Sequence, residues 1–132
     1  MTAALLALLM TMKPLLLGDA SPEAKLVVET SQVHEAGAGP AIARQVRMSG
    51  EAMLRAAEVS EGSSDLVVAV SVRTLRGSQL GYSSTVALRQ GGREVVIERQ
   101  RCELCTEGEA VAAVQRSMAG LAPKLHALAH GV

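Results

Sequence analysis

Two cysteines separated by two residues are the most reactive side chains in the sequence. Cys102 and Cys105 lie in the run Arg-Cys-Glu-Leu-Cys-Thr and are the chain's only cysteines. Cys102 ends a predicted strand, and Cys105 directly precedes a predicted helix whose amino terminus would stabilise a thiolate. Such a pair can form a local disulfide, exchange thiols with a partner, or hold a metal ion. The pair is therefore the first candidate site.

A local structural disulfide is the favoured interpretation in an exported chain, because oxidising compartments maintain disulfides. The redox alternative uses Cys102 as the attacking thiolate and Cys105 as the resolving one, or the reverse. That motif usually sits on a parallel strand–helix–strand unit of a thioredoxin-like fold, whereas here it ends a predicted antiparallel meander. A metal site made from the two thiols and a loop histidine such as His34 is the third alternative.

A His-x-x-x-His pair, His126 and His130, follows downstream and superficially completes a zinc-finger signature. Some twenty intervening helical residues at ~1.5 Å each would separate thiols from imidazoles by ~30 Å. Zinc needs all its ligands within ~2.3 Å, so this finger is excluded. The two histidines are predicted to line a solvated helical face, and we expect no metal site of this kind and no cofactor.

The helix predicted to follow the cysteines has the strongest sequence signals of any element in the chain. Thr106 and Glu109 match the Thr-x-x-Glu capping box that starts a helix. A stripe at spacings of three and four follows: Val111, Val114, Met118, Leu121, Leu125 and Leu128. Pro123 lies inside this run and is expected to kink the helix or divide it in two.

Upstream segments alternate between strand and helix signals. Ala24 to Gln32 is β-branched, 40–58 has helical periodicity, and 66–75 suits a central strand. A turn at Arg76 to Gln79 and the Gly91-Gly92 pair join the later strands, 81–90 and 93–102. The order β-α-β-β-β-α predicts a single α+β domain over residues 24–130. We expect a small, mostly antiparallel sheet of about four strands with two main helices on one face.

The amino-terminal residues 1–20 predict a cleavable leader. An apolar stretch broken by Lys13 and Pro14 is followed by small residues, as in a secretory signal peptide cleaved after Ala20. The stretch is too short and interrupted to span a bilayer, so no stable membrane span is expected in the mature protein. The predicted location is therefore periplasmic or secreted. If residues 1–20 are instead retained as an apolar helix, the alternative location is cytoplasmic.

Composition narrows the choice of partner. Thirteen basic and thirteen acidic residues cancel, and Tyr82 is the only aromatic side chain. A nucleic-acid partner is not expected, because such proteins normally carry a basic surplus and often stack bases on exposed rings. Arg73, Arg99 and Arg101 fall on neighbouring predicted strands and form a candidate interaction patch.

The run from Gly62 to Val72, a hairpin, the segment from Arg101 to Thr106 and a closing helix resemble small α/β domains of bacterial envelope proteins. They are similar to the amino-terminal domain of TolB and related periplasmic accessory domains, over about Lys25 to Leu125. The resemblance implies a non-catalytic domain that binds another envelope protein and inherits no catalytic residue. No propeller follows Val132, so a fragment or a stand-alone form is expected.

Overall fold

The computed structural model describes residues 22–35, 37–75 and 81–131. The predicted leader at 1–20 and the predicted turn at 76–79 lie outside these residues. The elements follow one another in the order β1 Glu23–Glu29, α1 Ala38–Ala56, β2 Ser60–Glu61, β3 Leu66–Thr74, β4 Gly81–Gln90, β5 Arg93–Glu103 and α2 Glu107–His130. Among the described helices, neither α1 nor α2 has the length and apolar character needed to cross a membrane.

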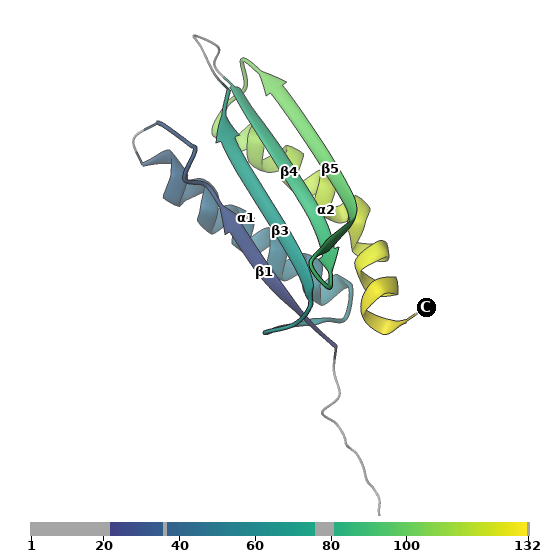
Figure 1. The fold of residues 1–132 in the computed structure, drawn as a ribbon. Helices are drawn as coiled ribbons and strands as arrows, with labels where there is room; N and C mark the ends of the chain where they lie inside the picture. Colours follow the sequence, from purple (N-terminus) through teal and green to yellow (C-terminus); the bar gives the residue numbers. More distant parts are fainter. Residues whose placement is uncertain (1–21, 36, 76–80, 132) are drawn as a thin grey trace, which may run out of the picture.

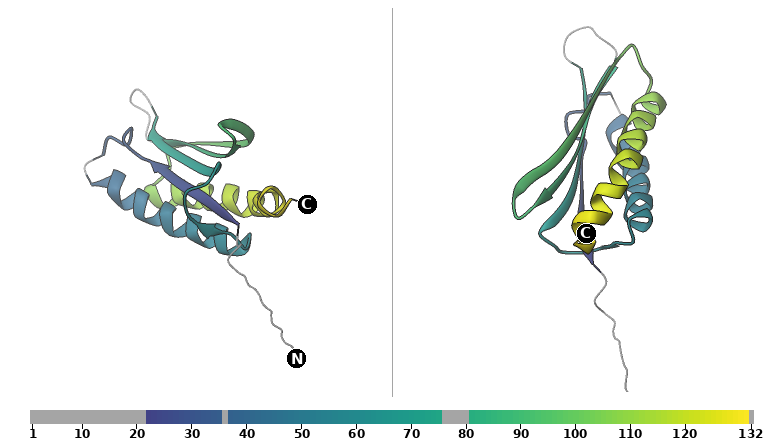
Figure 2. Two further views of the ribbon diagram at one scale, coloured as in Figure 1. Left: turned by 60° about the horizontal axis from the view of Figure 1, so that its bottom comes forward. Right: turned by 90° about the vertical axis from the view of Figure 1, so that its right-hand side faces the viewer.

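The strands form one sheet in the order β2-β1-β3-β4-β5. β1 runs parallel to both β2 and β3, because α1 carries the chain back before β3 begins. β3, β4 and β5 pair antiparallel. Both helices cover the same face of the sheet, so the molecule has two layers (Figures 1 and 2). The predicted α+β class and its single helical layer are confirmed. The sheet is mixed rather than mostly antiparallel, and the two-residue β2 adds a fifth strand at one edge.

Buried and more exposed side chains alternate along β3, and this alternation distinguishes the two faces of the sheet. Leu66, Val68, Val70 and Val72 are buried toward the helices, while the residues between them point to the other side. β3 lies between β1, which α1 contacts, and β4, which α2 contacts, so its apolar face is buried in the shared core. The β4–β5 hairpin turns at Gly91 and Gly92, whose φ angles of 62° and 80° are the left-handed pair that a two-residue turn requires.

Each helix contains a residue of a type that normally destabilises a helix: Gly50 in α1 and Pro123 in α2. Gly50 lies buried in α1 against Leu26 of β1, and a β-carbon there would come within 2.7 Å of the leucine side chain. Glycine thus lets the helix approach the sheet. In α2, Pro123 is exposed, so the carbonyl of Ala119 that loses its intrahelical donor can bond to water. Of the two effects predicted for Pro123, a kink or a division, the division does not occur, because α2 continues through Pro123 to His130.

Candidate functional site

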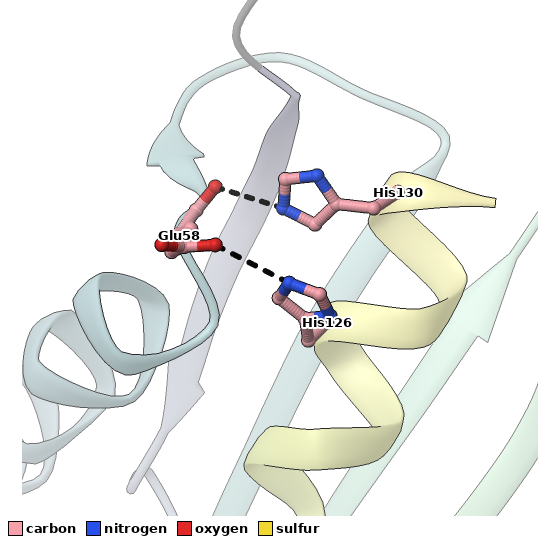
Figure 3. A group of neighbouring side chains, drawn as sticks. All are labelled: Glu58, His126 and His130. Atoms are coloured by element: carbon pink, nitrogen blue, oxygen red, sulfur yellow. Dashed lines mark hydrogen bonds and ion pairs between the residues drawn. The ribbon is translucent and has the colours of Figure 1, made fainter. Parts of the chain in front are cut away.

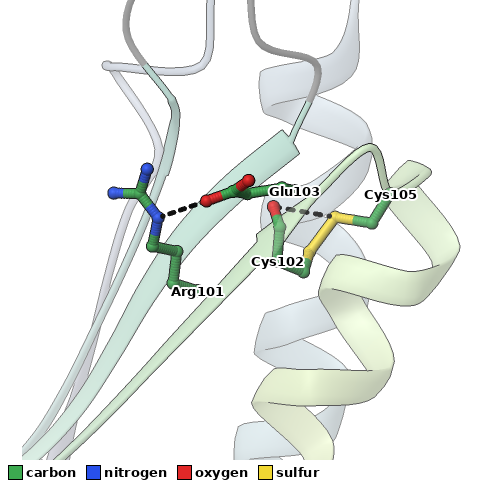
Figure 4. A network of polar contacts seen from close by, with 4 residues as sticks. All are labelled: Arg101, Cys102, Glu103 and Cys105. Carbon is green, nitrogen blue, oxygen red and sulfur yellow. Dashed lines mark hydrogen bonds and ion pairs between the residues drawn. A yellow bond between two sulfur atoms is a disulfide. The ribbon is translucent and has the colours of Figure 1, made fainter.

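The structure joins Cys102, near the end of β5, to Cys105, just before α2, in a disulfide. The two α-carbons are 5.9 Å apart, inside the range that a disulfide spans. Between them, Leu104 adopts a left-handed conformation with φ 56° and is 77% exposed. We call residues 102–106 the disulfide corner (Figure 4).

Thr106 starts α2 immediately after the disulfide. Its hydroxyl accepts from the Glu109 backbone N–H at 3.2 Å, and the Glu109 carboxylate accepts from the Thr106 backbone N–H at 2.8 Å. This reciprocal pair is the capping box that the sequence indicates. It fixes the direction in which α2 leaves the disulfide corner.

The chemistry of the disulfide corner is limited by its oxidised form. The Cys105 sulfur lies 3.4 Å from the Cys102 carbonyl oxygen, but a disulfide sulfur has no proton to donate, so this is only a contact. Cys102 lies one residue before the end of β5, which pairs antiparallel with β4, and Tyr82 is directly opposite it. This is not the parallel strand–helix–strand setting in which the motif serves exchange.

A cavity of about 350 Å³ separates β5 from the first half of α2 beside the disulfide corner. Ser84 faces it from β4 and is only 4% exposed. At the same end, Tyr82 donates to the Glu35 carboxylate at 3.4 Å, and Thr74 donates to the same oxygen at 3.2 Å. Burial raises the pKa of the Tyr82 phenol above its ordinary value, and the negative charges of Glu35 and Glu107 raise it further.

The three predicted arginines lie on the sheet face that the helices leave uncovered, which we call the outer face. Arg73 on β3 and Arg101 on β5 flank Ser83 of β4 in one cross-strand row, and Arg99 lies opposite Thr85 in the next row. All three arginines are exposed. Arg101 is paired with Glu103 at 3.3 Å, a surface ion pair of small energetic value. The structure therefore places the three on one face.

An apolar row crosses the outer face beside the arginines, and no sequence argument indicated it. The paired positions are Val27 of β1, Ala69 of β3, Ala87 of β4 and Ile97 of β5. Val27 is 38% exposed, Ala69 and Ile97 are half-buried, and Ala87 between them is buried at 1% exposed. A solvated sheet face normally carries polar side chains, so this row is a departure from the usual alternation.

His126 and His130 do more than line a solvated face, which corrects the sequence-based expectation. Their rings stack with centroids 4.3 Å apart, and both face the carboxyl end of α1 (Figure 3). The Nε2 atom of His126 lies 3.3 Å from a Glu58 carboxylate oxygen. The Nε2 atom of His130 lies 3.2 Å from the Ala57 carbonyl oxygen and 3.1 Å from that of Glu58. We call Glu58, His126 and His130 the histidine corner.

Glu58 occupies the position after α1 that favours glycine. Its φ is 59°, its N–H donates to the Arg55 carbonyl, and the Val59 N–H donates to the Leu54 carbonyl. These two bonds form a Schellman motif, in which a left-handed residue ends the helix. A glutamate here keeps a conformation that costs about 1–2 kcal/mol for a residue with a β-carbon.

The residue types that hold metal ions converge in the histidine corner. One ligand atom from each of Glu58, His126 and His130 lies within 4.8 Å of the other two. Among the described residues, Cys102, Cys105 and His34 form no such group. The spacing of the two histidines was visible in the sequence, but their carboxylate partner depends on how α1 packs beside α2.

Neither a family model nor a curated protein sequence matches the chain. Two solved structures are similar to it in part. A minor lipoprotein from Acinetobacter baumannii is 12% identical with a TM-score of 0.34, covering 84% of this chain and 94% of its own. A DUF330 protein from Xanthomonas campestris is 18% identical with a TM-score of 0.34, covering 83% and 86%. The resemblance to the TolB amino-terminal domain stays a prediction.

Proposed function

We propose that this chain is a non-catalytic exported domain that binds another envelope protein through its outer sheet face. The observation that supports binding is the apolar surface that Val27, Ala69 and Ile97 leave accessible on the outer face, beside the arginines. Exposed apolar surface rimmed by charge is typical of protein-interaction sites. Arg73 and Arg99 would add electrostatic steering toward an acidic partner.

The β5 edge of the sheet is a less suitable docking site than the outer face. β5 carries Glu94, Glu98, Arg99 and Glu103, and charged edge strands oppose pairing with another chain. The partner is therefore expected to pack on the outer face rather than to add a strand beside β5. Export is supported by the disulfide of Cys102 and Cys105, since disulfides of this kind persist in oxidising compartments.

Site-specific photo-crosslinking in the host cell tests this function. A photoreactive residue replaces Thr85, at the centre of the outer face, and in a matched variant it replaces Met48, which is 67% exposed on α1. We expect a single crosslinked product from position 85 and none from position 48. Adding Ile97→Lys or Arg99→Glu should then reduce that product strongly. Equal crosslinking from both positions, or none from position 85, would contradict the proposal.

The proposed compartment has its own measurement. Sequencing the amino terminus of protein isolated from the host should find a mature end near residue 21. Thiol counting on the same sample should find no free thiol until a reductant is added. An intact Met1 with two free thiols would reject export and leave the thiol alternatives in place.

A further inference from the structure

The histidine corner combines the ligand types that zinc prefers. Imidazole nitrogens and a carboxylate oxygen form three-ligand zinc sites in many proteins, with the remaining position open to water. His126 and His130 are four residues apart, which places them on one side of α2. Glu58 reaches the same point from the end of α1, so the set spans two elements.

The distances fit a coordination shell after small adjustments. Ligands bound at about 2.0–2.2 Å in a tetrahedral shell lie roughly 3.3–3.6 Å from one another. The His126 nitrogen and the Glu58 oxygen are already 3.3 Å apart, and all three ligand atoms lie within 4.8 Å. Closing the widest gap requires a side-chain movement of about 1 Å, which exposed side chains such as Glu58 can make.

The backbone around the histidine corner also favours a cation. α1 ends at Ala56 and α2 ends at His130, so the carboxyl ends of both helices meet here (Figure 1). Helix carboxyl ends carry partial negative charge and stabilise positive charge nearby. The Ala57 and Glu58 carbonyl oxygens accept from His130 Nε2 at 3.2 and 3.1 Å. When this nitrogen binds the ion instead, it loses these two hydrogen bonds, and the two carbonyl dipoles remain beside the cation. The left-handed conformation of Glu58 turns its backbone toward the same point.

We propose that Glu58, His126 and His130 bind one divalent transition-metal ion, Zn²⁺ by preference, which fastens the end of α1 to the last turn of α2. Each imidazole binds through a nitrogen lone pair, so any proton on that nitrogen passes to solvent as the ion enters. Hard cations such as Mg²⁺ prefer oxygen ligands and are not expected to compete. This inference is independent of the partner on the outer face.

Calorimetric titration with zinc chloride tests the site on the full chain, purified without an affinity tag and stripped with a chelator. We expect one ion per chain and a metal-dependent rise in melting temperature. His126→Gln and His130→Gln should each weaken binding by at least about tenfold, since even indirect supporting residues have effects of that size. His34→Gln removes the chain's only other histidine and should leave binding unchanged.

Glu58→Gly separates loss of a ligand from damage to the fold. Glycine suits the left-handed position, so the metal-free variant should melt at a higher temperature than the parent while binding zinc more weakly. No binding up to millimolar zinc would overturn the proposal. So would binding that persists unchanged in His126→Gln and His130→Gln, or that His34→Gln abolishes.

Discussion

Leu104 and Glu58 are the two described residues other than glycine with a left-handed backbone, and both lie beside a helix terminus. Leu104 precedes the amino end of α2, and Glu58 follows the carboxyl end of α1. At Leu104 a covalent bond between its neighbours closes the turn. At Glu58 the same conformation depends on hydrogen bonds of the Schellman motif and on contacts from α2.

This difference separates a structural corner from one that is able to bind a ligand. The Leu104 side chain is exposed and apolar, and nothing polar at that position gains from the strained backbone. The Glu58 side chain is polar and faces two imidazoles. Strained backbone that presents a functional group is a more specific indication of a site than strained backbone in a covalently closed turn. The two corners should therefore respond differently to the same substitutions.

Removing the disulfide should have the largest effect on stability. For a loop as short as residues 102–105, chain entropy gives a loss of about 2 kcal/mol for the double variant Cys102→Ser, Cys105→Ser. Urea denaturation of the parent and variant measures this loss as a change in the free energy of unfolding. The same variant should keep its zinc affinity, because the disulfide corner and the histidine corner lie at opposite ends of α2. A coupled loss of zinc binding would contradict this separation.

Glu58→Gly should stabilise the metal-free protein by about 1 kcal/mol, because glycine adopts the left-handed conformation without the clash of a β-carbon. Glu58→Ala is the matched control, since it removes the carboxylate but keeps the β-carbon. Thermal and urea denaturation should show no increase in the stability of the Glu58→Ala variant over the parent. If alanine stabilises as much as glycine, the carboxylate rather than the backbone is the source of the cost.

Leu104→Gly should also stabilise, but by an amount that depends on the disulfide. With the disulfide intact, the turn is already closed in the unfolded chain, so the gain should fall below about 1 kcal/mol. In the Cys102→Ser, Cys105→Ser background the full gain should appear. A double-mutant cycle measures this coupling, and strict additivity would show that the disulfide does not hold the turn.

Local signals in the sequence were enough to predict much of the fold. Thr106 and Glu109 fix the start of α2, Gly91 and Gly92 fix the hairpin, and the stripe from Val111 to Leu125 fixes the buried side of α2. These signals succeed because caps, turns and helical periodicity act over a few residues. Pro123 does not divide α2, because the cost of a helical proline depends on whether the carbonyl that loses its donor is exposed.

The candidate sites depend on contacts between residues distant in sequence, which local patterns do not contain. Glu58 and His126 are 68 residues apart and meet only because the two helices pack side by side. The apolar row on the outer face likewise needs the register of four strands, from Val27 to Ile97. The His-x-x-x-His spacing can be recognised in the sequence, but the sequence does not indicate that Glu58 lies beside these two histidines.

Tyr82 provides an optical test of how far the two corners are independent, and it is expected to show the smallest change. It lies opposite Cys102 and is the chain's only tyrosine, with no tryptophan to overlap it. Burial and the Glu35 charge raise the pKa of its phenol above that of the unfolded chain. The neutral phenol therefore contributes stability below the unfolded pKa, and this contribution is lost as pH rises through the higher folded pKa.

Absorbance at alkaline pH follows this titration directly. Glu35→Gln should lower the pKa of Tyr82 part of the way, because the burial contribution remains. Opening the disulfide corner by Cys102→Ser, Cys105→Ser should lower it as well, since solvent then reaches the phenol more easily. Glu58→Gly should leave it unchanged, because the histidine corner is at the far end of α2. A phenol that titrates in the folded parent as it does in a free peptide would show that Tyr82 is not buried in solution.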